Sequence, residues 1–432
     1  MSLRAGTAVV DITPPVGGHL AGFAVRRAPS VRVNDPLSAR AVAVSDGDNI
    51  SVVVALDLIA LTVEQHRAWR ERAARSAGIA PSNIVLTATH THGGPTVTPG
   101  ALGQEPDDAY LVSLEERVAD AVVKACSRLE PATITYEAGR CTGVASNRRK
   151  PDGPIDPLVP VITICDNLGA TKAVVFSYAC HPVVLGADNL AITADWPGAA
   201  RRRIEHSIPG ATAIYLQGCC GQLNTGHSSN ASMTTAPQQL RTFAESERIG
   251  ERIASEVLGL RRGDQPTAEK GVAVAERMVE LQFRSPGPEL EQAIESWKAE
   301  MPSANASRAA ILEVWLKWAA GRPELAPNRS QATVAAHRWG SVVLSFLPGE
   351  PFVEIALDIR QTTLRDQVLT AGYAGGVPGY MPYPPDAYLS GGYEVEDAHR
   401  FYGQPGAVEP SVGTRIVEAA VATISDVGSS QS

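Results

Sequence analysis

The chain has 432 residues, 44% of them hydrophobic and 19% charged, a balance that fits a globular protein with a large core. Its formal net charge is −8, and its basic residues form only short runs such as residues 201–203. We therefore exclude nucleic acid as a partner, because binding phosphates requires a basic surface.

The N-terminal residues contain no secretory signal, and the most apolar stretch, residues 50–61, is too short to span a bilayer and contains Asp57. The six cysteines include no C-x-x-C pair, and we expect them to be reduced thiols. These features predict a cytoplasmic protein without stable membrane insertion. No feature of the chain indicates its oligomeric state.

Short β-branched runs alternate with helical segments, which is typical of an α/β protein. Residues 51–55 (SVVVA) read as a buried strand. The helix predicted next covers residues 62–76, with Thr62 and Gln65 in capping-box spacing and Gly78 as its end. Further strands are predicted at residues 84–89, 159–165, 173–179, 211–216 and 342–346, and further helices at 110–129, 245–260 and 412–425.

Two later segments have a different character. Residues 286–327 combine helix-forming residues and proline boundaries with Trp297, Trp315 and Trp318, and we interpret them as a helical insertion or subdomain. Beyond Gly372 the chain becomes rich in Gly, Pro and Tyr. That stretch is too long for a simple connector, and long loops of this kind are often functional.

Candidate catalytic side chains follow the ends of the predicted strands. His90 and His92 lie two residues apart after residues 84–89, so they face the same side, either as two ligands or as a ligand and a proton shuttle. His181 and Glu350 follow two other strands. Singly, each has a structural explanation, and Asp57 is expected only to brace a turn or loop. Taken together, the histidines and Glu350 offer enough groups for the three N/O ligands that a catalytic zinc site requires.

Several other classes of site lack their usual motifs. The sequence contains no G-x-S-x-G elbow, no G-x-G-x-x-G loop and no phosphate-binding G-x-x-x-x-G-K-[ST] loop. The adjacent Cys219 and Cys220 have no basic neighbour that would activate a thiol, and we expect them to form a tight turn.

Six segments resemble, in order, the N-terminal catalytic domain of the neutral ceramidase family. They are AGTAVVDITPPVGGHLAGF, NIVLTATHTHGGP, ACHPVVLGADNLAITADWPGAARRRIE, YLQGCCGQLN, FLPGEPFVEIALDIR and GYMPYPPDAYLSGGYE. The resemblance implies an α/β fold with a central mixed β-sheet flanked by helices. We expect a single domain over residues 1–432, of a bacterial type without the family's immunoglobulin-like C-terminal domain. Residues 286–327 have no counterpart in the resemblance, and we expect them to cover or reshape the pocket.

The resemblance also implies a ligand set for Zn²⁺. Two histidines, a glutamate and a tyrosine hold the zinc in this family, and the matching positions here are His90, His181, Glu350 and Tyr380. A length difference of one residue leaves Tyr383 as an alternative for the tyrosine.

Three further residues match catalytic positions of the family. His92 corresponds to a residue that contacts substrate and moves protons, Arg148 to a substrate-binding arginine, and Tyr393 to a tyrosine near the scissile carbonyl. Asn224 stands where the family carries a serine that lines the pocket.

The function that the resemblance implies is zinc-dependent hydrolysis of a carboxamide by a metal-activated water. A small-molecule amide, such as an N-acyl amine, is the expected substrate. The alternatives are an esterase or lactonase that uses the same zinc, or a metal-binding family member without catalytic activity.

Overall fold

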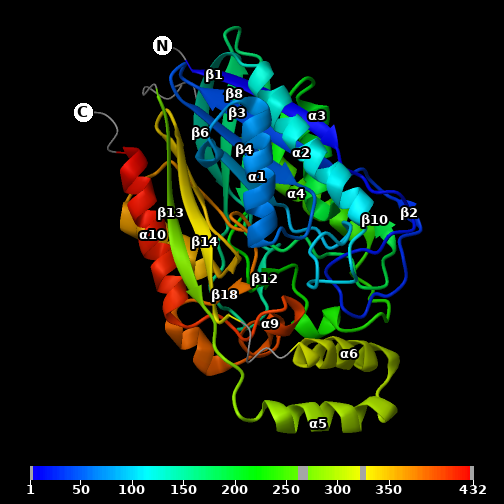
Figure 1. Cartoon of the computed structure of the whole chain (residues 1–432). Helices are drawn as coiled ribbons and strands as arrows, with labels where there is room; N and C mark the ends of the chain where they lie inside the picture. The colour runs from blue at the N-terminus through cyan, green and yellow to red at the C-terminus, as the bar shows by residue number, and fades with distance from the viewer. Residues whose placement is uncertain (1–2, 261–270, 322–326, 429–432) are drawn as a thin grey trace.

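In the part of the chain that the computed structural model describes, residues 3–260, 271–321 and 327–428, the framework is an eight-stranded mixed sheet (Figure 1). Its strand order is β11-β9-β8-β6-β1-β3-β4-β5, and the β4–β5 and β9–β11 pairs are parallel. The bounds are β1 (Arg4–Asp11), β3 (Ser38–Ser45), β4 (Ile50–Leu56), β5 (Ile84–Ala88), β6 (Glu130–Arg140), β8 (Leu158–Asp166), β9 (Thr171–Tyr178) and β11 (Thr212–Gln217).

A second, four-stranded sheet packs on one face of the first. Val42, Val53 and Ile162 of the large sheet share a buried cluster with Trp339 and Leu344 of the small one. Because side chains alternate across a strand, the same strands present a second apolar face to helices. The small sheet runs in the order β13 (Val272–Gln282), β14 (Arg329–Trp339), β15 (Val342–Phe346) and β17 (Val368–Ala371).

Helices cover the two outer faces and complete four layers. The large sheet is covered by α1 (Val63–Ala77), α2 (Asp108–Ser127), α3 (Asp195–Ser207) and α4 (Phe243–Gly259). The small sheet is covered by α7 (Val353–Thr363) and α10 (Ser411–Gly428). The α/β class with a central mixed sheet flanked by helices is thus confirmed, and the second sheet is an addition to it.

The start of α1 shows how local sequence sets an element. The Thr62 hydroxyl accepts from the Gln65 backbone N–H at 3.1 Å, and the Gln65 side chain accepts from the Thr62 N–H at 3.0 Å. This is the predicted capping box, which satisfies two N–H groups that the first helical turn leaves unpaired. Gly78 ends the helix with φ 69°, a conformation that glycine adopts at little cost.

Short ladders and helices shape the loops beyond the strand ends. The ladders pair β2 (Arg32–Val33) with β10 (Ala191–Ile192), β7 (Ser146–Asn147) with β12 (Leu223–Asn224), and β16 (Glu350–Pro351) with β18 (Tyr380–Met381). The short helices are η1 (Pro81–Asn83), η2 (Ser229–Ser232), η3 (Met301–Ser303), η5 (Pro385–Ser390), α8 (Tyr393–Glu396) and α9 (Ala398–Phe401).

The tryptophan-rich segment contains two helices, α5 (Leu290–Glu300) and α6 (Ala306–Ala320), which lie at one end of the structure with α9 nearby (Figure 1). Residues 322–326 of this segment lie outside the described residues. That residues 286–327 are an insertion in a single domain stays a prediction. Among the described helices, none has the length and apolar character needed to cross a bilayer.

The two edge strands of the large sheet, β5 and β11, lie close to each other, and a segment from the small sheet joins them. The Gly372 N–H donates to the Gln217 carbonyl of β11 at 2.9 Å. The next residue, Tyr373, accepts from the Ala88 N–H of β5 at 3.1 Å. Backbone hydrogen bonds thus connect the end of β17 to both edges of the large sheet, so loops from distant strands meet beside Tyr373.

A buried ion pair fixes the loop after β4. Both oxygens of the fully buried Asp57 bind the Arg201 guanidinium, at 2.8 and 2.7 Å, and one of them also accepts from the Ser38 N–H and hydroxyl. The other accepts from the Thr89 hydroxyl at 3.3 Å. Asp57 therefore has the bracing role expected from the sequence.

We expect Asp57→Asn to lower the free energy of unfolding by about 3–5 kcal/mol, because the substitution leaves the Arg201 charge buried without its partner. Urea denaturation followed by circular dichroism measures this change. The matched control is Asp120→Asn, which removes an exposed i,i+4 pair with Lys124 and should cost about 0.5 kcal/mol or less. Equal losses in the two variants would contradict this assignment.

His337 provides a pH-dependent contribution to stability. It is fully buried on β14, with Nδ1 2.7 Å from the Ser51 hydroxyl, and burial lowers its pKa to about 3. Between pH 7 and pH 5 the unfolded chain takes up a proton at this residue and the folded chain does not. Stability therefore falls as the pH falls through this range, by about 2 kcal/mol for His337.

The test is urea denaturation of the wild type and of His337→Gln at pH 7 and at pH 5. The variant should lose less stability between the two pH values than the wild type does, whereas the exposed His206→Gln should match the wild type. An identical loss in His337→Gln would show that this histidine does not contribute.

Candidate metal and catalytic site

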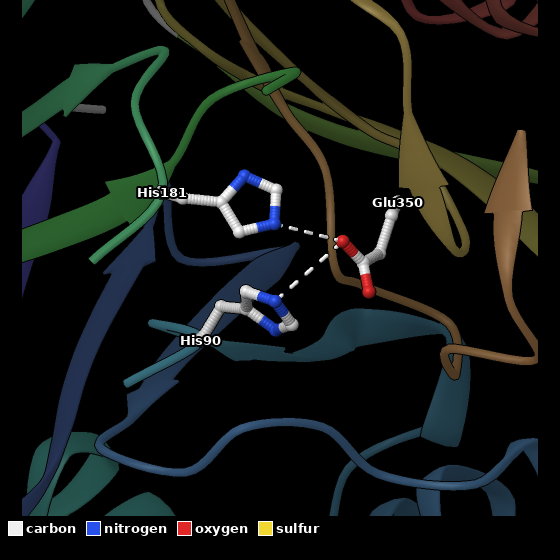
Figure 2. Close-up of side chains that lie close together, drawn as sticks. All are labelled: His90, His181 and Glu350. Atoms are coloured by element: carbon white, nitrogen blue, oxygen red, sulfur yellow. Dashed lines mark hydrogen bonds and ion pairs between the residues drawn. The ribbon is translucent and has the colours of Figure 1, made fainter. Parts of the chain in front are cut away.

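Three buried side chains from distant strand ends meet at one point (Figure 2). His90 follows β5, His181 follows β9, and Glu350 lies in β16. The Nε2 atoms of His90 and His181 lie 3.5 and 3.0 Å from the same Glu350 oxygen, Oε2. The three residues form a group in which one potential ligand atom from each lies within 4.8 Å of the others. The structure thus brings together three of the four predicted ligands.

The backbone fixes the protonation of both imidazoles. His90 Nδ1 lies 2.6 Å from the Ile59 carbonyl, and His181 Nδ1 lies 2.8 Å from that of Cys220. Because a carbonyl only accepts, each Nδ1 carries the proton and each Nε2 presents a lone pair. Burial lowers the pKa of His90 to about 4 and that of His181 to about 3, so both rings are neutral at pH 7.

The donor set fits a divalent cation. Two lone pairs that face one carboxylate oxygen repel it unless a positive charge lies between them. Neutral imidazoles and a carboxylate are also the ligands that catalytic zinc sites use. His90, His181 and Glu350 therefore have the chemistry and the arrangement that a bound metal requires.

The backbone of His90 is strained. Its φ is 65°, in the left-handed region, and Tyr373, whose ring centroid lies 4.4 Å from that of His90, has a φ of 57°. Such conformations cost about 1–3 kcal/mol each and persist where surrounding contacts hold them. Here the His90 N–H donates to the Leu58 carbonyl at 2.9 Å. The loop that Asp57 braces is thus the one that holds His90.

Two tyrosines that the sequence analysis missed orient Glu350. The Tyr402 hydroxyl donates to Glu350 Oε1 in a short hydrogen bond, and that of Tyr373 donates to Oε2 at 3.2 Å. Burial raises the pKa of Glu350, whereas the positive charge of Arg148 and the hydrogen bond from Tyr373 favour its ionised form. The only sequence signal for the two tyrosines was their position in the Gly-Pro-Tyr stretch.

The geometry separates the two candidate tyrosine ligands. Tyr380 is the ladder partner of Glu350, and its hydroxyl accepts from Arg148 Nη2 at 3.0 Å. The Tyr383 hydroxyl instead donates to the Asp358 carboxylate, away from the three-residue cluster. Tyr380 is therefore the tyrosine that lies beside the cluster.

A carboxylate that the sequence analysis did not single out holds Arg148. Glu394 accepts from Arg148 Nε at 2.8 Å and from Arg149 Nη1 at 2.7 Å. Burial alone would raise the pKa of Glu394, but the two arginines lower it below its ordinary value. Arg148 also donates to the Gly221 carbonyl at 2.9 Å. These contacts fix the orientation of the guanidinium.

The cluster opens into a cavity of about 300 Å³ that is lined by His92, His181, Arg148, Tyr380 and Tyr393. Among the described residues, no group hydrogen-bonds to either ring nitrogen of His92. The His92 ring centroid lies 5.1 Å from that of His90. All three predicted catalytic residues therefore line one cavity, and the ring nitrogens of His92 have no bond to break before they contact a ligand.

Glycine makes room for His92, and Asn224 has a local role. A Cβ on Gly22 would lie 2.4 Å from His92 Nδ1, so a larger residue would displace the ring. The buried Asn224 accepts from the N–H groups of Gly226 and His227 at 2.9 and 3.2 Å, and it donates to the His227 carbonyl at 2.7 Å. Its amide stabilises the turn that contains Gly226 and His227.

Part of the chain is similar in sequence to a known protein. The neutral ceramidase of Pseudomonas aeruginosa is 26% identical over 208 residues, which cover 41% of this chain and 31% of that protein. The match thus spans about a third of the length of that relative. No family model matches the chain.

Two solved structures share the fold over nearly the whole chain. The crystal structure of neutral ceramidase from Pseudomonas aeruginosa has a TM-score of 0.76 at 18% identity, covering 99% of this chain and 75% of that chain. A ceramidase complexed with C2 has a TM-score of 0.74 at 17% identity, with coverage of 99% and 76%. The chain is therefore related to the neutral ceramidases and has their fold, as the sequence resemblance predicted.

We expect the purified protein to bind one Zn²⁺ per chain and His181→Ala to bind it much more weakly. The loss should exceed about 100-fold, since removing even a group that only supports a metal ligand costs about 10–100-fold. Equilibrium dialysis followed by elemental analysis measures the binding. His206→Ala, on the exposed side of α3, is the control and should retain the metal. Full zinc content in a folded His181→Ala would contradict the ligand assignment.

Proposed function

We propose that this protein is a zinc-dependent hydrolase that cleaves a carboxamide bond, with an N-acyl amine or a related small amide as substrate. One observation carries the proposal. Two neutral imidazoles and a carboxylate face a single point beside a cavity that His92 lines. The neutral ceramidase fold of the chain supports an amide as the bond that is cleaved.

His90, His181 and Glu350 would hold the metal, and Tyr380 would be the fourth ligand. A zinc ion bound there would polarise a carbonyl group and lower the pKa of a bound water to about 7. The Glu350 carboxylate is already oriented by Tyr402. The two histidines are already in the tautomer that coordinates through Nε2.

His92 would move the proton. Its ring nitrogens have no hydrogen-bond partner among the described residues, and the ring borders the cavity next to His90. In this position an imidazole accepts a proton from the attacking water and then donates it to the leaving nitrogen. Because no described residue hydrogen-bonds to the His92 ring nitrogens, one of them is available to take the proton from water and pass it to the leaving nitrogen.

Arg148 and Tyr393 would stabilise the negative charge that develops on the substrate carbonyl oxygen. Both line the cavity, and Glu394 fixes the Arg148 guanidinium before substrate binds. A donor that is already oriented does not need to reorganise as charge develops, which is the main source of electrostatic catalysis. Glu394 neutralises part of the Arg148 charge. The main contribution of Glu394 is therefore to hold the Arg148 guanidinium in position.

The experiment is a substrate panel of N-acyl amines, N-acyl amino acids, a ceramide, esters and lactones, assayed with and without a chelator. We expect chelator-sensitive hydrolysis of at least one amide. If esters or lactones are hydrolysed in a chelator-sensitive way and no amide is cleaved, the protein would instead be an esterase or lactonase. Absence of any turnover at full zinc occupancy would favour a metal-binding protein without catalytic activity.

His92→Ala should lower kcat/KM for the best amide by about 10²–10⁴-fold, the usual contribution of a general acid or base. Its zinc content should stay that of the wild type, since His92 is not part of the group formed by His90, His181 and Glu350. Stopped assays on protein of known metal content separate the two effects. His206→Ala should retain full activity, and an unchanged kcat/KM in His92→Ala would remove this residue from the mechanism.

A further inference from the structure

Helix α6 is apolar on two opposite sides, because it lies between two partners. Leu312 and Leu316 belong to a cluster with Trp297 of α5, whereas Ile311 belongs to a cluster with Phe23 and Phe401 of the main body. A helix that is apolar around most of its circumference is usually buried. Figure 1 shows α6 between α5 and α9, at the end of the structure where the loops of the site gather.

A half-buried cation helps to hold α5 and α6 against the body. The Arg400 guanidinium of α9 lies 4.5, 5.2 and 5.6 Å from the ring centroids of Trp315, Trp297 and Trp318. A guanidinium over an indole face is an attractive contact that strengthens away from water. Both helices therefore share one anchoring residue, and all three tryptophans of the segment contribute to it.

Trp318 is fixed on two sides. Its Nε1 donates to the Gln404 carbonyl at 2.8 Å, and its ring centroid lies 5.3 Å from that of His399. The preceding residue, Lys317, pairs with Glu105 at 3.0 Å, which joins α6 to the end of the loop whose residues 100–104 line the cavity. The indole therefore has a defined place and forms a firm boundary.

This fixed indole lines the same cavity as His92 and His181. Val314 and Trp318 of α6 border it, together with the apolar side chains of Phe23 and Phe401. The volume of about 300 Å³ lies at the lower end of the range of about 300–1,000 Å³ that small-molecule sites occupy. The cavity is therefore small for a ligand site, and α6 forms one of its walls.

We infer that Trp318 and Val314 determine specificity by limiting the length of the apolar group that can enter beside the three-residue cluster. The identification of that group as the acyl chain of an amide rests on the proposed function. The substrate class is then an amide with a short acyl chain, and a long-chain lipid amide is excluded by the indole of Trp318.

The test uses straight-chain carboxylates of 4 to 14 carbons, which mimic the acid half of the product and bind without turnover. Isothermal titration calorimetry on the zinc-loaded protein should show affinity rising by about fourfold per methylene that leaves water, up to a limiting length. Trp318→Ala should move this limit to longer chains and raise the affinity for the longest carboxylates by at least tenfold. Val314→Ala should give a smaller shift in the same direction.

Leu316→Ala is the matched control, because it removes an apolar side chain of the same helix from the face that packs on α5. It should keep the limit of the wild type. An unchanged limit in both Trp318→Ala and Val314→Ala, an equal shift in Leu316→Ala, or no binding of any carboxylate would overturn the inference. Failure of amide hydrolysis would overturn the proposed function alone, since these affinities do not depend on turnover.

Discussion

The site depends on the hydrogen bond that each metal-facing imidazole forms through Nδ1, the ring nitrogen that points away from Glu350. His90 and His181 can direct Nε2 at Glu350 only because backbone carbonyls hold their Nδ1–H groups. One of these carbonyls follows β4 and the other follows β11, near opposite edges of the eight-stranded sheet. The Gly372 N–H, which donates to Gln217, and the Tyr373 carbonyl, which accepts from Ala88, connect to both edges and bring those loops together. The small sheet, whose strand β15 leads into the loop that carries Glu350, therefore also closes the framework that orients the two histidines.

The sequence predicted the parts of this arrangement that have a local signal. The capping box at Thr62, the apolar strands and the side chains after strand ends all appear where patterns of a few residues placed them. The long strands β13 and β14 escaped prediction, because charged residues such as Glu276 and Arg277 interrupt the apolar pattern of a strand half exposed to solvent. Their strand state depends on pairing with each other, which no short window of sequence contains.

In the site, too, the residues with a short sequence motif were predicted, and those placed only by packing between distant segments were not. Short motifs identified His90, His181, Glu350 and His92. Tyr402 and Tyr373 were missed because their contact with Glu350 follows from how three separate loops pack. Only the family resemblance suggested a tyrosine ligand, and only the ladder between β16 and β18 separated Tyr380 from Tyr383. Asn224 differs from the family pattern, and its amide forms hydrogen bonds within its own turn.

The ladder that places Glu350 beside Tyr380 also has a consequence for folding. His181 and Glu350 are 169 positions apart in the chain. Glu350 follows strand β15 of the small sheet, which must dock on the large sheet before the two residues can meet. Contacts of such long range form late, because loop-closure entropy has to be overcome first. A partly folded chain therefore lacks the assembled group of His90, His181 and Glu350, and metal binding by these residues would mark the completion of folding.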